Sequence, residues 1–402
     1  MANNYVFNDS LPIAPLKIAA LESITPLAQK VNEHILKFRQ NDTEELIRRK
    51  ADLHYRGYDV ESYLLSCACP RFGSGEAKAV IKESTRGADI FAMVDVTNYS
   101  CTYKVNGFIN HMSPDDHFQD LKRLIGACVA TAHRVNVIMP FLYESRQHKK
   151  THRESLDCAM ALQELVNMGV SNIITFDAHD PRVQNAIPLN GFDNFMPTYQ
   201  FVKALFEHDK DLQIDKDHLM IISPDEGAMN RAVYLANNLG VDVGMFYKRR
   251  DYSRILNGRN PIVAHEFLGT SVEGKTVLII DDMISSGESM LETAKELKER
   301  KAAKVIVCCT FGLFTNGWEK FDDFYQKGLI DYVITTNLNY RPAPLLERPW
   351  YIEADMSKYM AAIINSFNHD VSIGRTLTPT EKIQKLIRIH QNDGYDYFQT
   401  LF

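Results

Sequence analysis

The chain has little of what marks nucleic-acid-binding or membrane-spanning proteins. Its 402 residues carry a net charge of −6 and no strongly basic stretch, so nonspecific binding to nucleic acid is not expected. No apolar run approaches the roughly 20 residues that cross a bilayer, which argues against a membrane partner. The first residues also lack the basic segment and apolar stretch of a secretion signal. We therefore expect a cytoplasmic protein.

Cysteine is scarce and shows no metal-binding pattern. Seven are present, and neither the Cys67/Cys69 pair nor Cys308-Cys309 belongs to a CxxC…CxxC zinc site. We expect all seven to be reduced thiols that are mostly buried. The sequence also has no Walker A motif, which argues against a P-loop kinase.

Short apolar runs alternate with helical patterns along most of the chain. The runs are rich in Val and Ile, as parallel strands covered on both faces usually are. They predict strands at residues 88–96, 135–140, 172–176, 219–222, 241–247, 276–280, 305–310 and 332–336, with helices at 154–168, 228–238 and 289–300. Such alternation predicts an α/β fold with mostly parallel sheets flanked by helices. Two sets of strands suggest two domains, residues 1–200 and 201–402.

The two ends of the chain are less informative. The segment up to about Arg71 is rich in helix formers and charges and is left unassigned. The tail, residues 379–402, predicts a polar helix followed by an aromatic end that docks on its own domain or on a neighbouring subunit.

The segment at residues 281–289 is the first candidate site. It follows a buried strand and reads Asp-Asp-Met-Ile-Ser-Ser-Gly-Glu-Ser. Ligands of open parallel sheets bind at the C-terminal ends of strands, and small residues entering a helix present N–H groups to an anion. The acids Asp281 and Asp282 suit sugar hydroxyls or the water around Mg²⁺. The alternative is a tight turn with two solvated acids.

This segment resembles the phosphoribosyl diphosphate loop of phosphoribosyltransferases and ribose-phosphate diphosphokinases. The resemblance implies that Asp281 and Asp282 hold the ribose hydroxyls. It also implies that the 5-phosphate is bound by Ser285, Ser286, Gly287, Glu288 and Ser289. The loop by itself does not separate the two enzyme classes.

Five further motifs resemble the ribose-phosphate diphosphokinase family, in its order along the chain. They are Arg-Phe-Gly-Ser-Gly-Glu at 71–76, Ser-Arg-Gln-His at 145–148, Phe-Asp-Ala-His-Asp at 176–180, Ser-Pro-Asp-Glu-Gly at 223–227 and Tyr-Lys-Arg-Arg at 247–250. Taken singly, each also fits a surface turn, a basic loop or a helix cap.

The resemblance implies a role for one or two residues of each motif. Phe72, Glu76, Arg146, Gln147 and His179 would bind ATP, the first two across a subunit interface. His179 and Asp225 would hold the metal, and Asp225 would also help to bind the ribose phosphate. Lys248 and Arg250 would stabilise the transferred group, since phosphoryl transfer depends on positioning and charge neutralisation.

The sequence thus predicts a ribose-phosphate diphosphokinase. It would transfer the diphosphoryl group of ATP to the 1-hydroxyl of ribose 5-phosphate, with Mg²⁺ as cofactor, in a homo-oligomer built from dimers, with hexamers known in the family. A phosphoribosyltransferase is one alternative, supported by the Ser-Ser-Gly loop. An inactive regulatory homologue is the other, supported by four positions where the family usually has an acid: Ser74, His148, Thr151 and Ser285.

Overall fold

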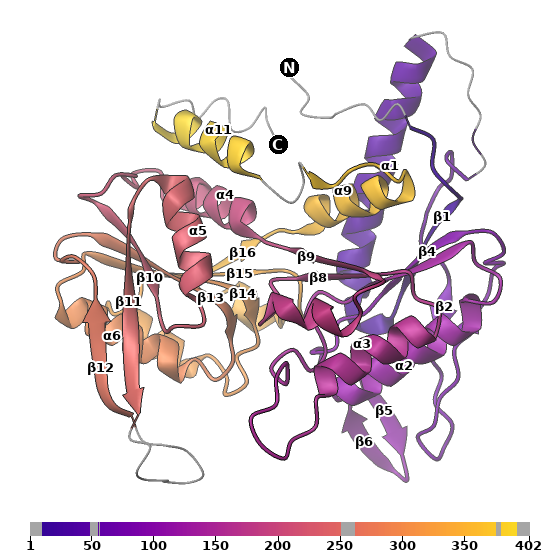
Figure 1. Ribbon diagram of the computed structural model, residues 1–402, viewed down its shortest axis with the longest axis horizontal. Helices are drawn as coiled ribbons and strands as arrows, with labels where there is room; N and C mark the ends of the chain where they lie inside the picture. The colour runs from indigo at the N-terminus through magenta and orange to yellow at the C-terminus, as the bar shows by residue number, and fades with distance from the viewer. Residues whose placement is uncertain (1–9, 49–54, 56, 251–261, 375–378, 392–402) are drawn as a thin grey trace.

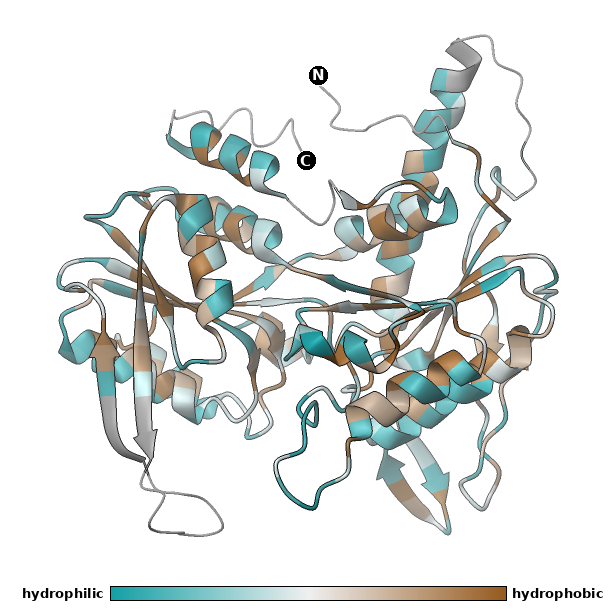
Figure 2. Ribbon diagram, in the orientation of Figure 1, coloured by the Kyte–Doolittle hydropathy of each residue, from teal (hydrophilic) through white to brown (hydrophobic). Residues whose placement is uncertain are grey.

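Two separate β-sheets organise the chain (Figure 1). The computed structural model describes residues 10–48, 55, 57–250, 262–374 and 379–391. Both sheets are covered by helices, and the apolar residues concentrate in the strands and on the helix faces turned toward them (Figure 2). The predicted α/β fold is confirmed.

The first sheet is parallel throughout, with strand order β1-β4-β7-β8-β9. Its strands are β1 (Leu16–Ala20), β4 (Asp89–Met93), β7 (Arg134–Ile138), β8 (Asn172–Phe176) and β9 (Gly191–Phe195). The helices α1 (Thr25–Arg48), α2 (Pro114–Cys128) and α3 (Asp157–Asn167) pack on it. Ser113 opens α2 with a capping box, because its hydroxyl accepts from the Asp116 N–H and the Asp116 carboxylate accepts in return.

The second sheet has the order β12-β11-β10-β13-β14-β15-β16. Its strands are β10 (Leu219–Ser223), β11 (Asp242–Arg250), β12 (Ile262–Leu268), β13 (Thr276–Ile284), β14 (Lys304–Gly312), β15 (Tyr332–Thr336) and β16 (Tyr351–Ala354). Only the β11–β12 pair is antiparallel. Two apolar clusters fill its two faces. The helices are α4 (Thr198–His208), α5 (Met229–Leu239), α6 (Glu288–Glu299), α7 (Glu319–Gln326), α8 (Ala343–Leu346) and α11 (Thr380–Gln391).

Short elements complete the described part of the chain. Two small antiparallel sheets pair β2 (Cys67–Ala68) with β3 (Val80–Ile81) and β5 (Thr102–Val105) with β6 (Phe108–His111). The 3₁₀ turns are η1 (Glu22–Ile24) and η2 (Pro181–Ala186). All seven cysteines are free thiols. In the described residues, no helix combines the length and apolar composition of a membrane span.

Helix α9 (Ser357–Asn368) follows the second sheet in sequence but packs on the first. It lies beside α1 in Figure 1, and Met360, Ile363 and Ile364 belong to the first apolar core. Arg39 of α1 donates to the side-chain oxygens of Asn365 at 3.2 Å and Asn368 at 2.6 Å. The division into domains at residue 200 stays a prediction, with α9 as one later element that joins the earlier core.

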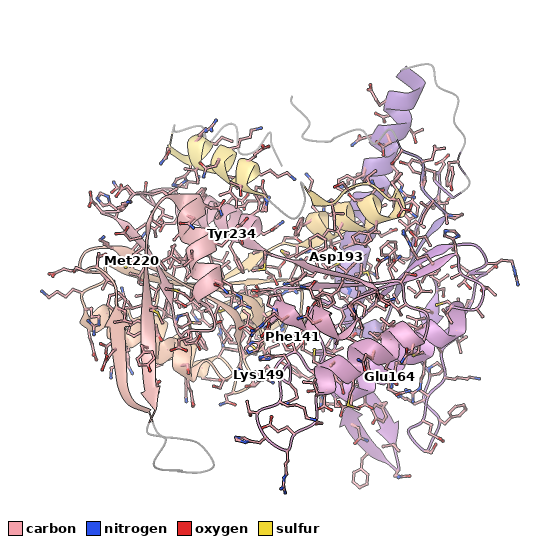
Figure 3. The ribbon with its side chains drawn as sticks, viewed as in Figure 1. Phe141, Lys149, Glu164, Asp193, Met220 and Tyr234 are labelled. Atoms are coloured by element: carbon pink, nitrogen blue, oxygen red, sulfur yellow. The ribbon has the colours of Figure 1, made fainter. Side chains whose placement is uncertain are left out.

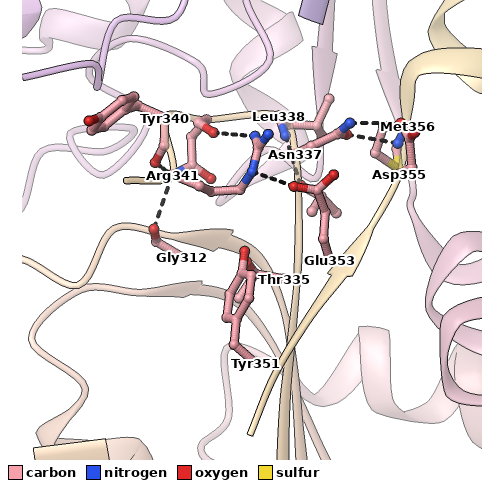
Figure 4. A network of polar contacts seen from close by, with 12 residues as sticks. Gly312, Thr335, Asn337, Leu338, Tyr340, Arg341, Tyr351, Glu353, Asp355 and Met356 are labelled. Carbon is pink, nitrogen blue, oxygen red and sulfur yellow. Dashed lines mark hydrogen bonds and ion pairs between the residues drawn. The ribbon is translucent and has the colours of Figure 1, made fainter. Parts of the chain in front are cut away.

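A polar network fixes the chain where it leaves the second sheet (Figure 4). The Asn337 side chain donates to Asp355 at 2.7 Å and accepts from the Met356 N–H at 2.8 Å. Arg341 donates to Glu353 at 2.7 Å. The neighbouring Tyr340 N–H donates at 2.7 Å to the buried Asp95, in the segment that follows β4, so the network also ties the two sheets together.

The edge strands β1, β9, β12 and β16 were not predicted, and β13 is longer than the apolar run at 276–280 indicated. This strand continues past Ile280 to Ile284, because β14 runs alongside it and pairs Asp281 with Cys309 and Met283 with Phe311. The two acids therefore lie on an extended strand end, and the turn begins at Ser285. A rigid strand holds its side chains in more defined directions than a loop does.

Candidate active site

A cavity of about 1190 Å³ opens where strands of both sheets end. The segments after β8, β10 and β13 line it, together with residues that follow β7. Lys149, from the first half of the chain, and Tyr234 on α5 both border this cavity and are labelled in Figure 3. The position agrees with the expectation for open parallel sheets, because the C-terminal ends of strands leave their polar termini for ligands.

Asp281 and Asp282 lie at one edge of the cavity and differ in their environment. Burial and the charges of Asp282 and Asp225 raise the pKa of Asp281 well above its ordinary value. Burial also disfavours the charged form of Asp282, but the hydrogen bond from His179 and the charge of Arg231 outweigh it and lower that pKa. Asp282 is therefore the carboxylate held as an anion, and Asp281 is the one that takes up a proton more readily.

His179 contacts Asp282 directly. Its Nδ1 lies 2.7 Å from Oδ2 of Asp282, and this hydrogen bond raises the pKa of His179 although burial opposes the shift. The bond crosses between the sheets, from the loop after β8 to β13. The second imidazole nearby is that of His148, whose ring centre lies 5.3 Å from that of His179. His148 Nε2 lies 3.5 Å from Asp180.

Beneath His179, Arg231 and Asp177 form a buried ion pair. Arg231 Nε donates to Oδ1 of Asp177 at 2.6 Å, and the Thr310 hydroxyl donates to Oδ2 at 2.6 Å. Asp177 has a φ of +42°, a region that non-glycine residues seldom adopt. These contacts join segments that follow β8 and β10 to strand β14.

Asp225 borders the cavity from the turn after β10. Its Oδ1 accepts from the N–H groups of Gly227 at 2.9 Å and Ala228 at 3.2 Å, and the Ser223 hydroxyl donates to its carbonyl at 2.6 Å. Side chains within the turn therefore stabilise it, and the same contacts would be present if the motif were only a helix cap. Within the described part of the chain, Oδ2 has no hydrogen-bond partner, and it can accept from a ligand or coordinate a cation.

The turn after β13 presents small residues to the same cavity. Its lining members are Ser285, Ser286, Gly287 and Ser289. Gly287 has a φ of +81°, and a Cβ there would lie 2.5 Å from the Phe321 ring, so this position requires glycine. Glu288 does not line the cavity. Its carboxylate turns outward and receives a hydrogen bond from Lys320 at 2.8 Å.

Four of the predicted ATP-binding residues do not line the cavity in this single chain. Phe72 is 51% exposed in the turn before β3, where Glu76 accepts a hydrogen bond from Ser74 at 2.8 Å. Arg146 is exposed, and its charge is close enough to oppose in small part the rise in the pKa of His179 that Asp282 causes. Gln147 donates to the carbonyl oxygen of Ser155 at 2.8 Å.

The predicted catalytic cations are described only by their backbone. Lys248 and Arg250 are in the last part of β11, paired with His265 and Ile262 of β12. Their side chains, and the segment at 251–261, lie outside what the structure describes.

Several cavity residues were not predicted as site residues. Asp177, Arg231, Lys149 and Arg182 lie along its wall, and Thr310 supports it from β14. Asp177 and Arg231 stand inside or next to the motifs that pointed to the site, at Phe-Asp-Ala-His-Asp and after Ser-Pro-Asp-Glu-Gly. Their position near the motifs was visible in the sequence, but their pairing depends on two chain segments 54 residues apart.

The donor set at the cavity fits a hard cation that is shared with a ligand. The described residues contain no group of three or more His, Cys, Asp or Glu side chains that could hold a metal alone. Mg²⁺ is usually bound by one or two carboxylates together with phosphate oxygens and water. The charges of Asp282 and Asp225 act on Asp281, and a cation near them would relieve this repulsion.

Comparisons with known proteins match both halves of the chain. Residues 16–169 match the N-terminal domain of ribose phosphate pyrophosphokinase, and residues 201–345 match the phosphoribosyl transferase domain. A ribose-phosphate pyrophosphokinase of Staphylococcus epidermidis is 28% identical over 312 residues, 77% of this chain and 80% of the relative. That of Staphylococcus saprophyticus is 27% identical over 307 residues, 76% of this chain and 80% of the relative.

A solved structure has the same fold. The phosphoribosylpyrophosphate synthetase from Mycobacterium smegmatis superimposes with a TM-score of 0.66 at 20% identity, covering 89% of this chain and 99% of that one. The two matched segments, residues 16–169 and 201–345, follow each other in the family's order, and the cavity lies between the two sheets. The chain belongs to the ribose-phosphate pyrophosphokinase family of enzymes.

Proposed function

We propose that the chain catalyses the transfer of the diphosphoryl group of ATP to the 1-hydroxyl of ribose 5-phosphate. The hydroxyl oxygen forms a bond to the β-phosphorus, the bond from that phosphorus to the bridging α,β-oxygen breaks, and AMP leaves. The observation that carries the proposal is the hydrogen bond between His179 and Asp282. It joins the predicted nucleotide side of the cavity to the predicted ribose side.

The ribose side is formed by β13 and the turn that follows it. Asp282, held as an anion, accepts hydrogen bonds from ribose hydroxyls, and Asp281 supplies a second carboxyl beside it. The N–H groups and hydroxyls of Ser285, Ser286, Gly287 and Ser289 suit the 5-phosphate, at the start of α6, where the helix dipole assists. Glu288 takes part through its backbone, since its side chain pairs with Lys320.

On the nucleotide side, cations offset the charge of the triphosphate. Arg146, Gln147 and His179 orient ATP, while Lys248 and Arg250 stabilise the charge that develops on the transferred group. Phe72 and Glu76 contribute from a neighbouring subunit. Their position outside the cavity of the single chain agrees with such sharing. The protein would therefore act as a homo-oligomer built from dimers.

Mg²⁺ is the proposed cofactor, with His179 and Asp225 as its ligands from this chain. When bound, it would neutralise the charge of the phosphates. The carboxylate of Asp225 suits it better than the imidazole does, because Mg²⁺ prefers oxygen ligands.

The two alternatives are less well supported. A phosphoribosyltransferase does not account for residues 16–169, which match the pyrophosphokinase N-terminal domain. An inactive homologue would rest on the replaced acids, but these residues make ordinary contacts. Ser74 donates to Glu76, Thr151 to Glu154, and Ser285 lines the cavity.

The direct test is to incubate the pure protein with ATP, ribose 5-phosphate and Mg²⁺ and to measure AMP and phosphoribosyl diphosphate. We expect both products in equal amounts. Binding of ribose 5-phosphate without formation of either product would instead favour the inactive homologue. Consumption of added phosphoribosyl diphosphate with a nucleobase would favour the transferase.

A further inference from the structure

Arg231 borders the cavity and contacts several of the segments that carry the candidate site residues. It projects from α5, and its side chain is 11% exposed. Its Nε donates to Asp177 at 2.6 Å, while one terminal nitrogen lies 3.4 Å from the Ala178 carbonyl oxygen and 3.8 Å from the Asp282 carboxylate. The other terminal nitrogen donates to the Gly227 carbonyl oxygen at 3.4 Å.

All three guanidinium nitrogens are therefore engaged by the protein itself. The two terminal nitrogens each carry a second N–H group, so Arg231, which borders the cavity, holds the surrounding framework and can still donate to a ligand. What it contacts is the framework of the site: the segment that carries His179, the turn that carries Asp225, and β13 with Asp282. Arg suits such a position, because its planar fork holds several acceptors in fixed directions and stays charged when buried.

Asp177, which accepts the hydrogen bond from Arg231 Nε, has a strained backbone. Asp177 combines a φ of +42° with a buried side chain, and this burial raises the pKa of its carboxyl. The charge of Arg231 and the hydrogen bonds from Arg231 and the Thr310 hydroxyl oppose this rise without outweighing it. Residue 177 is thus held in an unfavourable conformation by its partners, and His179 follows two residues later.

We propose that Arg231 is a positioning residue of the ribose-phosphate site, which holds His179 and Asp282 in register across the two sheets. The inference rests on the proposed function, since it assigns Arg231 to the same site. The guanidinium ties the backbone before His179 to α5 and keeps a positive charge beside Asp282. Without Arg231, the segment that carries His179 would lose its contact with α5, and the 2.7 Å hydrogen bond between His179 and Asp282 would be held less firmly.

The expected effect is on the binding and use of ribose 5-phosphate. Arg231→Gln removes the charge and most of the contacts, and it should lower kcat/KM for ribose 5-phosphate on the order of 10²-fold, as small misplacements at reacting groups do. Arg231→Lys keeps the charge but cannot reach Asp177, Ala178 and Gly227 together. It should restore part of the loss and raise KM more than it lowers kcat.

Arg134 provides a matched control. It is 16% exposed and donates to the buried Asp89 through two nitrogens at 2.9 Å each, but it lies in the first sheet away from the cavity. Arg134→Lys and Arg134→Gln should lower the melting temperature and leave KM for ribose 5-phosphate unchanged. A structural loss is thereby separated from a loss of positioning.

A double-mutant cycle tests the route through Asp282. If Arg231 acts through it, then Arg231→Lys combined with Asp282→Asn should lose little more ribose 5-phosphate affinity, measured by calorimetry, than Asp282→Asn alone. Fully additive losses would contradict the proposal. If the Arg231 variants do not fold, Thr310→Val withdraws one hydrogen bond from Asp177 and should raise the same KM several-fold.

The failure of this inference differs from that of the proposed function. A wild-type protein that neither binds ribose 5-phosphate nor forms AMP would overturn the function and the inference with it. An active wild type whose folded Arg231 variants keep kcat/KM within twofold, while the Arg134 variants behave likewise, would overturn only the role of Arg231.

Discussion

His179 and Asp282 stand 103 residues apart in sequence, and their side chains are joined by a hydrogen bond of 2.7 Å. The bond makes the two acids at the end of β13 chemically different. Asp282 is kept as an anion by His179 and Arg231, whereas burial and its neighbours' charges raise the pKa of Asp281. Two adjacent acids can therefore have separate roles toward one sugar.

The first prediction concerns this difference. Asp282→Asn should weaken the binding of ribose 5-phosphate on the order of 10- to 100-fold, because it replaces a charged acceptor and leaves His179 without its partner. Asp281→Asn should weaken it less, since the amide resembles the protonated form that this site favours. Titration calorimetry of both variants measures the two losses. Equal losses would show that the acids act alike.

Gly287 is the subject of the second prediction. Gly287→Ala should destabilise the protein by more than about 2 kcal/mol, because left-handed backbone costs a non-glycine residue about 1–2 kcal/mol and the new Cβ would also meet the Phe321 ring. It should also weaken phosphate binding at the turn. Urea unfolding gives the free energy.

Gly274 is the matched control for that variant. It has a φ of +76°, but nothing lies within 4 Å of a Cβ built there. Gly274→Ala should therefore show only the backbone cost. A loss as large as that of Gly287→Ala would show that the contact with Phe321 has no effect.

Lys248 carries the third prediction. Lys248→Ala should lower turnover by orders of magnitude while the affinity for ribose 5-phosphate changes little, because this cation acts on the transferred group and not on the sugar. Steady-state rates of AMP formation and calorimetry with ribose 5-phosphate separate the two effects. An active Lys248→Ala variant would remove this residue from the mechanism.

The fourth prediction is a pH dependence away from the site. His369 closes α9 in a buried position, and burial lowers its pKa to about 4. The unfolded chain, with a pKa near 6.5, binds the proton first as the pH falls, so stability decreases between about pH 6.5 and about pH 4. The shift corresponds to on the order of 3 kcal/mol.

Urea unfolding of His369→Gln and of the wild type at each pH provides the comparison. This variant lacks the titrating group, so the difference between its free energy of unfolding and that of the wild type should change with pH across that window. A constant difference from pH 7 to pH 4 would show that His369 makes no contribution to the acid sensitivity.

The sequence by itself determined the parts of this protein that depend on nearby residues. Apolar runs predicted β4, β7, β8, β10, β11, β13, β14 and β15, because burial on both faces of a parallel strand leaves a local pattern. The edge strands β1, β9, β12 and β16 were not predicted. Segment 281–289 and the ordered motifs gave the family because their residue types are adjacent in the chain. The start of the chain was not assigned, because a composition rich in helix formers and charges does not by itself set the bounds of a helix such as α1.

Only the tertiary structure decided how these parts meet. The pairing of His179 with Asp282, the Asp177–Arg231–Thr310 contacts and the return of α9 to the first sheet each join distant segments. Their partners are selected by packing, which local patterns do not encode. The same holds for Glu288, which the motif placed at the phosphate and whose side chain lies outside the cavity, where it pairs with Lys320.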